Sequence, residues 1–415
     1  MLTHFRAQGF KSLADVELDL APLVVLMGPN AAGKSNLLEA FLLLSRLATE
    51  QSLSAAFAPP LRGYPLEAFT LPEGGLEALL QQEHAELTLE AVIQPSRSNG
   101  EEAAEPLQYR VSVRIQPMTG SLEVADEFLT RPSLQSPLIE RSGNDLILRR
   151  QNSRFKASRY EIGRDHTLVS RSGLASPRHS DVERLRNKFF AWQTYYLDPR
   201  EAMREPQPPR DVTDIGPRGE WIAPFLYRLK QSETLSKHFR GIGRALQQAI
   251  PTIESLDVEL DPRRGTLDIL IRQDGTLYSS RVMSEGTLRV LALCCLAANP
   301  WPGELIAFEE PENGVHPRRI EVIADLLASM ASGGKSQVVV TTHSPTLIAA
   351  LLQRSRESPG QIKFFQCSQV GMTSQVKPFE IEGALFEDPE IRKALTGPED
   401  EQIVEALLKR GWLDG

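Results

Sequence analysis

The pattern of apolar and polar residues predicts an α/β fold. Residues 2–20 alternate as a half-buried hairpin does, and the apolar run Leu23–Met27 is typical of a buried parallel strand. A glycine-containing loop follows, and then a helix over about Ser35–Leu47. Nearer the C-terminus, helical patterns alternate with two more apolar strands, Leu305–Phe308 and Gln337–Thr342. Strands that alternate with helices favour a parallel sheet.

The middle of the chain has a different pattern. From Glu86 to Thr167, short alternating segments separated by polar turns predict an antiparallel β insertion. Residues 204–219 are rich in proline, charge and glycine without periodicity, and we expect them to form a surface loop or a mobile linker. A helical stretch near residues 225–250 and two strands, 255–260 and 266–272, complete this region.

Length and charge narrow the class of protein. A chain of 415 residues exceeds the usual size of one core, so we expect one large domain with an insertion, or two domains. The net charge of −8 argues against a protein that coats nucleic acid indiscriminately. One segment departs from this average, because residues 141–188 contain twelve Lys and Arg against five Asp and Glu.

The cysteines and the apolar runs indicate a compartment. Three cysteines offer neither a paired disulfide framework nor a Cys-x-x-Cys metal pattern, so we expect buried, reduced thiols at Cys294, Cys295 and Cys367. The N-terminal residues lack the apolar core of a signal peptide. Every apolar run falls short of the ~20 residues that a membrane span needs. The expected location is the cytoplasm, with no membrane partner.

The segment Gly28–Ser35, with the sequence GPNAAGKS, matches the phosphate-binding loop pattern between a predicted strand and a predicted helix. Its glycines let the backbone curl so that successive N–H groups face phosphate oxygens. Lys34 supplies a positive charge for the β- and γ-phosphates, and the Ser35 hydroxyl is a ligand for Mg²⁺. We therefore expect ATP to be bound by Asn30, Ala31, Ala32, Gly33, Lys34, Ser35 and Asn36.

Two predicted strands end in residues with catalytic chemistry. The strand at Leu305–Phe308 is followed by Glu309 and Glu310, and the strand at Gln337–Thr342 is followed by His343. Parallel strands deliver such residues to the carboxyl edge of the sheet, where ligands bind. Glu309 would hold Mg²⁺ through water, and Glu310 would orient or deprotonate the attacking water. His343 would sense the γ-phosphate through a hydrogen bond.

Ser284, Glu285, Gly286 and Thr287 open another predicted helix. Ser284 is suited to cap the helix N-terminus, which is a purely structural role. The alternative is an anion site, because a glycine at a helix start leaves exposed N–H groups and room for a ligand. The residues alone leave both interpretations open.

Together and in this order, these elements resemble the ATPase heads of the ABC superfamily, and more narrowly the RecF/OLD/SMC-related group of AAA-type ATP-binding proteins. The matching pieces are Phe10–Leu13, Gly28–Ser35, Ser284–Thr287, Glu309–Glu310, Asn313–Pro317 and Thr342–Pro345. The resemblance implies a P-loop ABC-ATPase head with a mixed or parallel central sheet flanked by helices, plus an antiparallel β-rich and helical insertion. It divides the chain into a first half-head, an insertion, a second half-head and a C-terminal segment, at residues 1–50, 51–280, 281–352 and 353–415.

The resemblance also implies how the site is completed. In that family the signature segment of one subunit contacts the γ-phosphate bound by the other, in a head-to-tail dimer with two ATP molecules. Carried over, the signature Ser284–Thr287 would act in trans and Asn313 would lie at the dimer seam. Three features depart from the family pattern. Glu309 stands where most ABC proteins have aspartate, Glu285 stands where the signature usually has glycine, and Gln193 matches the Q-loop only weakly.

The C-terminal segment bears on whether the chain carries a second activity. OLD-type nucleases resemble this chain but have a metal-dependent nuclease domain after the corresponding histidine. Here the residues after His343 predict one strand, 362–366, and helices near 389–395 and 401–409, without an acid pair at a strand end. We therefore expect that the chain lacks its own nuclease and works with a separately encoded effector protein, a nuclease or a toxin.

Two functions fit these features. In the first, ATP-driven dimerisation is a motor or switch in phage defence or DNA repair that engages an effector or DNA. In the second, ATP locks a homodimer or higher oligomer as a scaffold that holds a toxin or nuclease, and hydrolysis is slow or dispensable. A transporter ATPase is disfavoured by the β-rich insertion. Two interpretations of the basic stretch are equally good: its side chains bind DNA phosphates, or they lie on solvated strand faces. The residues concerned are Arg149, Arg150, Arg154, Lys156 and Arg159.

Overall fold

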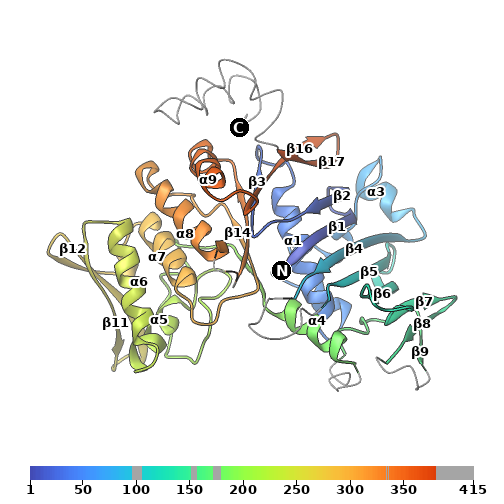
Figure 1. Ribbon diagram of the computed structural model, residues 1–415, viewed down its shortest axis with the longest axis horizontal. Helices are drawn as coiled ribbons and strands as arrows, with labels where there is room; N and C mark the ends of the chain where they lie inside the picture. The colour runs from blue at the N-terminus through green and yellow to red at the C-terminus, as the bar shows by residue number, and fades with distance from the viewer. Residues whose placement is uncertain (96–104, 151–156, 172–178, 333, 335, 380–415) are drawn as a thin grey trace, which may run out of the picture. The chain divides into compact units, whose positions relative to one another are not determined.

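The computed structural model describes most of the chain, over residues 1–95, 105–150, 157–171, 179–332, 334 and 336–379 (Figure 1). The chain forms two compact units. Unit 1 comprises Met1–Ala21, Pro29–Trp192 and Phe365–Pro378. Among the described residues, unit 2 comprises Pro22–Gly28, Gln193–Phe364 and Phe379.

Unit 1 contains an antiparallel sheet of eight strands in the order β2-β1-β4-β5-β6-β7-β8-β9. The N-terminal hairpin is confirmed, with Phe5 opposite Leu18, and its first strand also pairs with β4. The predicted antiparallel insertion therefore extends the same sheet as the hairpin. The strands are β1 (Leu2–Phe10), β2 (Leu13–Asp19), β4 (Ala85–Ile93), β5 (Leu107–Gln116), β6 (Ser121–Thr130), β7 (Ile139–Ser142), β8 (Asp145–Leu148) and β9 (Ser158–Glu161).

The long helix of unit 1 follows the phosphate-loop sequence and packs on β1. Its Phe41 ring lies 4.4 Å from that of Phe5, between ring centroids, and its Ser45 hydroxyl donates to the carbonyl of Phe189 at 2.8 Å. The helix thereby buries one side against the sheet and against α4. The helices are α1 (Lys34–Thr49), α2 (Leu53–Ala56), η1 (Pro65–Ala68), α3 (Gly75–Leu80) and α4 (Ser180–Phe190).

Unit 2 is built on a sheet whose strands are ordered β10-β14-β15-β3-β16. The pairs β14–β15 and β15–β3 are parallel, as the sequence predicts. Every residue of β3 and β15 is buried, which explains their continuous apolar runs. The strands are β3 (Leu23–Met27), β10 (Trp192–Tyr195), β14 (Leu305–Glu309), β15 (Gln337–Thr342) and β16 (Ile362–Val370), and β16 continues into unit 1, where β17 (Thr373–Phe379) is its neighbour.

Helices and a second sheet surround this parallel sheet in unit 2. Helix α8 packs on β3 and β15, and α7 lies between α6 and α8 (Figure 1). Helix α5 packs on β11 and β12, α6 packs on β11, and β13 extends this antiparallel sheet. The elements are α5 (Ile222–Gln231), α6 (Ser236–Ala249), β11 (Ile253–Asp261), β12 (Thr266–Gln273), β13 (Thr276–Ser279), η4 (Ser280–Val282), α7 (Glu285–Ala297), η5 (Pro317–Arg319), α8 (Ile320–Ser332) and α9 (Pro345–Glu357).

Some details differ from the sequence-based expectations. The helical stretch near residues 225–250 is two helices, because the chain turns between α5 and α6. The segment 204–219 has no helix or strand and most of its residues are exposed, as predicted for a surface loop, while Val212 and Ile215 anchor it in the core of unit 2. Strands β13 and β17 were not predicted. The expected helices near 389–395 and 401–409 lie outside the described residues.

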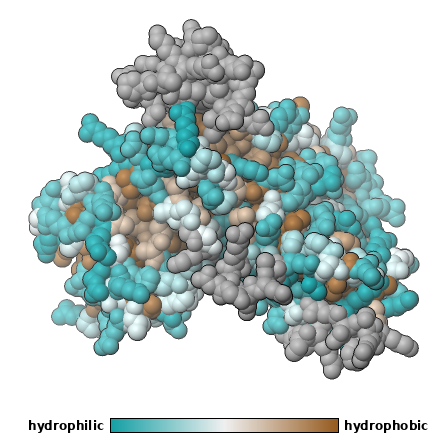
Figure 2. All heavy atoms as spheres, in the orientation of Figure 1, coloured by the Kyte–Doolittle hydropathy of each residue, from teal (hydrophilic) through white to brown (hydrophobic). Residues whose placement is uncertain are grey.

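Two further expectations can be compared with the described residues. All three cysteines are buried free thiols, as predicted, and burial raises the pKa of Cys294 and of Cys367 to about 12. Among the helices of the described ranges, none combines the length and the apolar character that crossing a bilayer requires. Hydrophilic residues cover much of the face shown in Figure 2.

Candidate functional site

The phosphate-loop sequence bends sharply between β3 and α1. Ala31 and Gly33 have φ angles of 66° and 90°, in the left-handed region. Gly33 is also required by a close approach, because a Cβ at this position would lie 1.9 Å from the Oγ atom of Ser374. A side chain at position 33 would therefore push the loop away from β17.

Lys34 is the first residue of α1 and is folded back over the loop. Its side chain is buried, and its Nζ atom donates to the carbonyl of Pro29 at 2.8 Å. The loop thus encloses an ammonium group at the N-terminal end of a helix of 16 residues. Both the positive charge and the first N–H groups of the helix favour an anion at this place.

Two residues far from the loop in sequence support its geometry. The Ser12 Oγ atom lies 2.7 Å from the Oγ of Ser374 and accepts a hydrogen bond of 2.7 Å from the Nδ2 of Asn36. The Ser374 N–H donates to the Ser12 carbonyl at 2.8 Å. Ser12 belongs to the opening segment that resembles the ATPase family. Ser374 carries no signal in the sequence, and only the fold brings it here.

A hollow of about 360 Å³ adjoins Ser12 within unit 1. One wall is charged, since Lys11 and Arg62 both contact the fully buried carboxylate of Glu39, and Arg62 Nε lies 2.7 Å from it. Phe69, Leu71 and Met372 add apolar side chains. The lining residues are Lys11, Ser12, Arg62, Gly63, Glu67, Phe69, Leu71 and Met372.

The parallel strands of unit 2 bring the other motifs to one rim of their sheet. In register, Glu309 lies opposite Thr341, and Thr342 lies opposite Met27. Glu310, His343 and Gly28 therefore follow the ends of three adjacent strands. The Nδ1 atom of His343 lies 2.7 Å from Oε1 of Glu310. The predicted meeting of the acidic strand end and the histidine is confirmed.

Glu310 has a strained backbone. Its φ angle of 46° lies in the left-handed region, and its N–H group donates to Thr341, at 3.2 Å from both the carbonyl and the side-chain oxygen. A non-glycine residue in this conformation costs on the order of 1–3 kcal/mol, and such strain clusters at functional sites. The side chains of Glu310 and His343 are 22% and 44% exposed, so both are accessible to a ligand at the rim.

Glu312 is a buried acid at the same rim that the sequence reasoning missed. Its Oε1 atom accepts a hydrogen bond from the Thr342 hydroxyl, and within the described residues its Oε2 atom has no partner. Burial raises the pKa of this carboxyl, while the bond from Thr342 lowers it. The sequence does show an acid two residues after Glu310. A third acid after a strand does not by itself predict a buried position or a role, however.

The signature segment begins helix α7. Ser284 caps the helix, because its Oγ atom accepts from the Thr287 N–H at 3.1 Å, so the structural interpretation of this serine is confirmed. The residue is nevertheless exposed. Gly286 contacts a neighbouring turn so closely that a Cβ would lie 2.7 Å from the Gly314 carbonyl oxygen. The exposed Asn313 belongs to that turn, so the signature and the predicted seam residue lie together.

Basic residues of the 141–188 segment are largely engaged with their own unit. Arg149 pairs with Glu140 at 2.5 Å, and Arg184 pairs with Asp181 at 3.1 Å. Arg141 donates to backbone carbonyls. These contacts favour solvated strand faces over a track for DNA phosphates. Arg154 and Lys156 lie outside the described residues.

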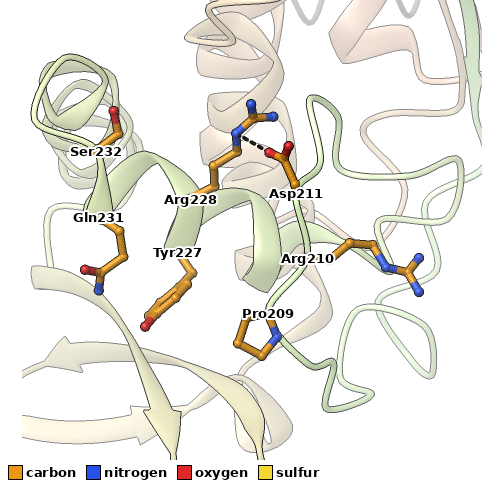
Figure 3. A pocket seen from close by; sticks show the side chains of 7 residues that line it. All are labelled: Pro209, Arg210, Asp211, Tyr227, Arg228, Gln231 and Ser232. Carbon is orange, nitrogen blue, oxygen red and sulfur yellow. Dashed lines mark ion pairs between the residues drawn. The ribbon is translucent and has the colours of Figure 1, made fainter.

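Two other predicted or visible features stand apart from the motifs. Gln193 lies in β10, where its side-chain oxygen accepts from the Tyr195 hydroxyl at 2.8 Å, and its Q-loop role stays a prediction. A second hollow, of about 430 Å³, lies between α5 and the preceding loop (Figure 3). Its Arg228 is held by Asp211 at 2.9 Å and by the Trp301 ring at 4.2 Å. None of the motif residues lines this hollow.

Comparisons with known proteins agree with this geometry. The family model described as "AAA domain, putative AbiEii toxin, Type IV TA system" matches residues 23–349, which is more than half of the chain. A search of curated proteins finds no match.

Two solved SMC heads have a similar fold. A structure of the SMC head bound to the C-winged-helix domain of ScpA aligns with a TM-score of 0.53 and 15% identity, over 92% of this chain and 98% of that chain. A Pyrococcus furiosus SMC head with an extended coiled coil, bound to the C-terminal domain of ScpA, aligns with a TM-score of 0.53 and 14% identity, over 94% and 99%. The predicted α/β fold of an ABC-ATPase head is thereby confirmed. With the family match over residues 23–349, the chain belongs to the AAA-domain family of that description.

Proposed function

We propose that this chain is a Mg²⁺-dependent ATPase whose two copies close around two ATP molecules, and that this closure is a switch for a separately encoded effector. One observation carries the proposal. The ends of β14, β15 and β3 are adjacent at one rim, so Glu310, His343 and the start of the phosphate loop leave the sheet together. This is the edge at which open α/β sheets bind ligands.

The residues present fit a nucleoside triphosphate. The loop at 29–33 has left-handed residues at Ala31 and Gly33, a conformation suited to N–H groups that bind phosphate, and Lys34 supplies a charge that can exchange its Pro29 carbonyl for phosphate oxygens. The hollow beside Ser12 has apolar walls at Phe69 and Leu71 and is large enough for a nucleoside. We propose that it receives the base and ribose.

Magnesium fits the oxygen donors at the two motif ends. We propose that the Ser35 hydroxyl and, through water, the Glu309 carboxylate hold it. Within the described residues no cluster of three His, Cys, Asp or Glu side chains could hold a metal alone, so phosphate oxygens would complete the coordination. When bound, Mg²⁺ neutralises charge that develops on the phosphates.

Hydrolysis is proposed to use the Glu310–His343 pair. The Glu310 carboxylate would orient water for attack on the γ-phosphate and accept its proton, since its second oxygen is not the atom that lies 2.7 Å from His343. His343 would donate a hydrogen bond to the γ-phosphate through Nε2. The strained backbone of Glu310 fixes the carboxylate before ATP arrives.

Dimerisation is proposed to complete the site in trans. Ser284 is exposed at the N-terminus of α7, whose free N–H groups favour an anion, and Asn313 is exposed on the turn beside it. Two-fold closure would place the Ser284–Thr287 signature of each copy on the γ-phosphate held by the other. The effector would be a nuclease or toxin in phage defence or DNA repair, in the cytoplasm. The paired arginines of residues 141–188 make DNA a less favoured partner.

ATP turnover by the purified chain tests the proposal. Glu310→Gln is expected to lower the rate by about 10²-fold or more, the usual contribution of a general base. Glu357→Gln, a matched change at an exposed residue of α9, is expected to keep the parental rate. A parental chain that does not hydrolyse ATP in the presence of Mg²⁺, or a Glu310→Gln variant that hydrolyses it normally, would contradict the mechanism.

The scaffold function remains the second candidate, because the family description names a toxin of a toxin–antitoxin system. A switch must reset through hydrolysis, whereas a scaffold need only stay closed. Glu310→Gln separates them in cells that contain the effector. If Glu310→Gln loses the cellular function of the parent chain, the switch is supported. If the variant still performs that function, the scaffold is supported.

A further inference from the structure

The start of the signature helix is exposed, and yet its backbone must be held still if it is to meet a phosphate. Ser284 follows the short turn η4 and the extended residue Met283, whose φ and ψ are −65° and 155°. A single 3-10 turn is too short to satisfy its own carbonyls, and the Met283 carbonyl follows its end. These carbonyls need hydrogen-bond donors from elsewhere in the chain.

One arginine supplies these donors. The Nη1 atom of Arg204 donates to the carbonyl oxygens of Ser280 and Arg281, at 3.2 and 2.6 Å. Its Nη2 atom donates to the Met283 carbonyl at 2.6 Å, and its Nε atom donates to the Pro199 carbonyl at 2.7 Å. A single guanidinium therefore joins two segments that are about eighty residues apart in sequence. Its planar set of donors matches four carbonyls, which the compact ammonium of lysine cannot do.

Arg204 is itself held in place by the fold of its segment. The Asp198 carboxylate accepts hydrogen bonds of 3.1 Å from the N–H groups of Arg200 and Glu201, which turns the chain toward Arg204. Met203, the neighbouring residue, is 2% exposed and anchors the segment in the core of unit 2. The guanidinium thus starts from a fixed backbone rather than from a mobile loop.

A second contact links the same segment to the signature. Arg200 Nε lies 2.9 Å from a carboxylate oxygen of Glu285, the residue that stands where the family signature usually has glycine. Residues 198–204 therefore contact the signature on both sides of Ser284. Residues 198–204, which follow β10, thus hold the start of α7 in place, and we call them the brace.

We infer that Arg204 is a positioning residue, which fixes the backbone before Ser284 so that the signature can meet the ATP of a second copy. This inference rests on the proposed function. It assigns a role to the proline-rich segment 204–219 that its composition does not predict. The hydrogen bonds of Arg204 go to the Pro199 carbonyl and to carbonyls of residues 280–283, which precede Ser284.

The test compares Arg204→Lys with Arg356→Lys, a matched change at an exposed arginine of α9. In the Glu310→Gln background, Arg204→Lys is expected to bind ATP like its parent but to dimerise with ATP about tenfold or more weakly, equivalent to about 1.4 kcal/mol. Arg356→Lys is expected to dimerise normally. If the parent itself does not dimerise with ATP, the proposed function fails. If the parent and Arg204→Lys dimerise equally, the inference alone fails.

ATP turnover by a mixture of two variants distinguishes a positioning role of Arg204 from a purely structural one. Arg204→Lys has an impaired signature, and Lys34→Ala has an impaired phosphate loop but an intact signature. In the mixed dimer, the ATP of the Arg204→Lys chain faces the intact signature. Turnover by the mixture is therefore expected to exceed the sum of the two separate rates. Absence of this complementation, with both chains folded, would overturn the inference.

Amide hydrogen exchange on the unaltered chain makes the test independent of how well a variant folds. The N–H groups of Thr287 and Leu288 donate to the side chain and the carbonyl of Ser284. Because the brace is present without ATP, these amides are expected to be protected in the free chain. Exchange as fast as in an open loop would show that the signature is not positioned in advance.

Discussion

Replacing Gly286 by alanine is expected to destabilise unit 2 and to displace the start of α7. A Cβ at this position would lie 2.7 Å from the carbonyl oxygen of Gly314 and 3.3 Å from the Cα of Val315. Ordinary contacts of a Cβ begin near 3.4 Å, so the turn that carries Gly314 must retreat by about 0.7 Å. Both opposing atoms belong to the backbone, and neither can move aside as a flexible side chain would.

Two effects of opposite sign set the magnitude. Overpacking of this kind costs about 1–3 kcal/mol. Alanine is favoured over glycine within a helix by up to about 1 kcal/mol, and less at the first turn, where Gly286 lies. The net cost is therefore expected to be about 0–3 kcal/mol. Gly241→Ala in α6 is the matched control, because nothing lies within 4 Å of its added Cβ, and it is expected to stabilise by about 0.5–1 kcal/mol.

Urea or thermal unfolding of the two variants measures the difference, and ATP-driven dimerisation measures its functional consequence. The close approach predicts that Gly286→Ala is less stable than Gly241→Ala by about 0.5–4 kcal/mol. It also predicts weaker dimerisation for Gly286→Ala alone, because the displaced turn carries both the signature contact and Asn313. Equal stability of the two variants would refute the argument from the Gly314 carbonyl.

Three further predictions concern unit 1. Gly33→Ala is expected to weaken ATP binding by at least about tenfold, because the added Cβ meets Ser374 and φ is +90°, and unchanged affinity in calorimetry would contradict this. Burial raises the pKa of the Glu127 carboxyl from 4.5 to about 7, so the folded state keeps this proton to a higher pH than the unfolded chain does. The free energy of unfolding should therefore fall by on the order of 3 kcal/mol as the pH rises from about 4.5 to 7. Urea midpoints measured at pH 5 and pH 8 should show this loss in the parent and not in Glu127→Gln, and identical slopes would refute it. Lys11→Met removes one of two cations that contact the fully buried Glu39, which should cost about 3 kcal/mol, and an unchanged unfolding temperature would argue against it.

The sequence predicts those parts of the fold and site in which local pattern and structure coincide. Buried parallel strands are continuous apolar runs, and β3 and β15 are recognisable for this reason. Their register then follows from parallel pairing, and so does the meeting of Glu310 with His343. The phosphate-loop sequence between such a strand and a helix is a specific signal for nucleotide binding, because its glycines, its lysine and its serine all suit the same phosphate ligand.

Features that depend on contacts between distant segments could not be predicted. Ser374 approaches Gly33 only because β17 folds back onto the loop, and its sequence surroundings resemble any polar hairpin. The role of Arg204 is set by carbonyls about eighty residues away. Composition predicts the surface loop at 204–219, but it does not reveal that a few apolar side chains, such as Ile215, anchor this loop in a core. The positive φ of Glu310 is also invisible in sequence.

The central claim is that ATP held at the rim of the parallel sheet joins two copies of this chain. Light scattering of Glu310→Gln, with and without ATP and Mg²⁺, tests it most directly, with the double variant Lys34→Ala/Glu310→Gln as the control. The account predicts that ATP doubles the mass of Glu310→Gln and leaves the double variant as a single chain. A Glu310→Gln chain that binds ATP and stays monomeric, or a double variant that dimerises equally well, would contradict it.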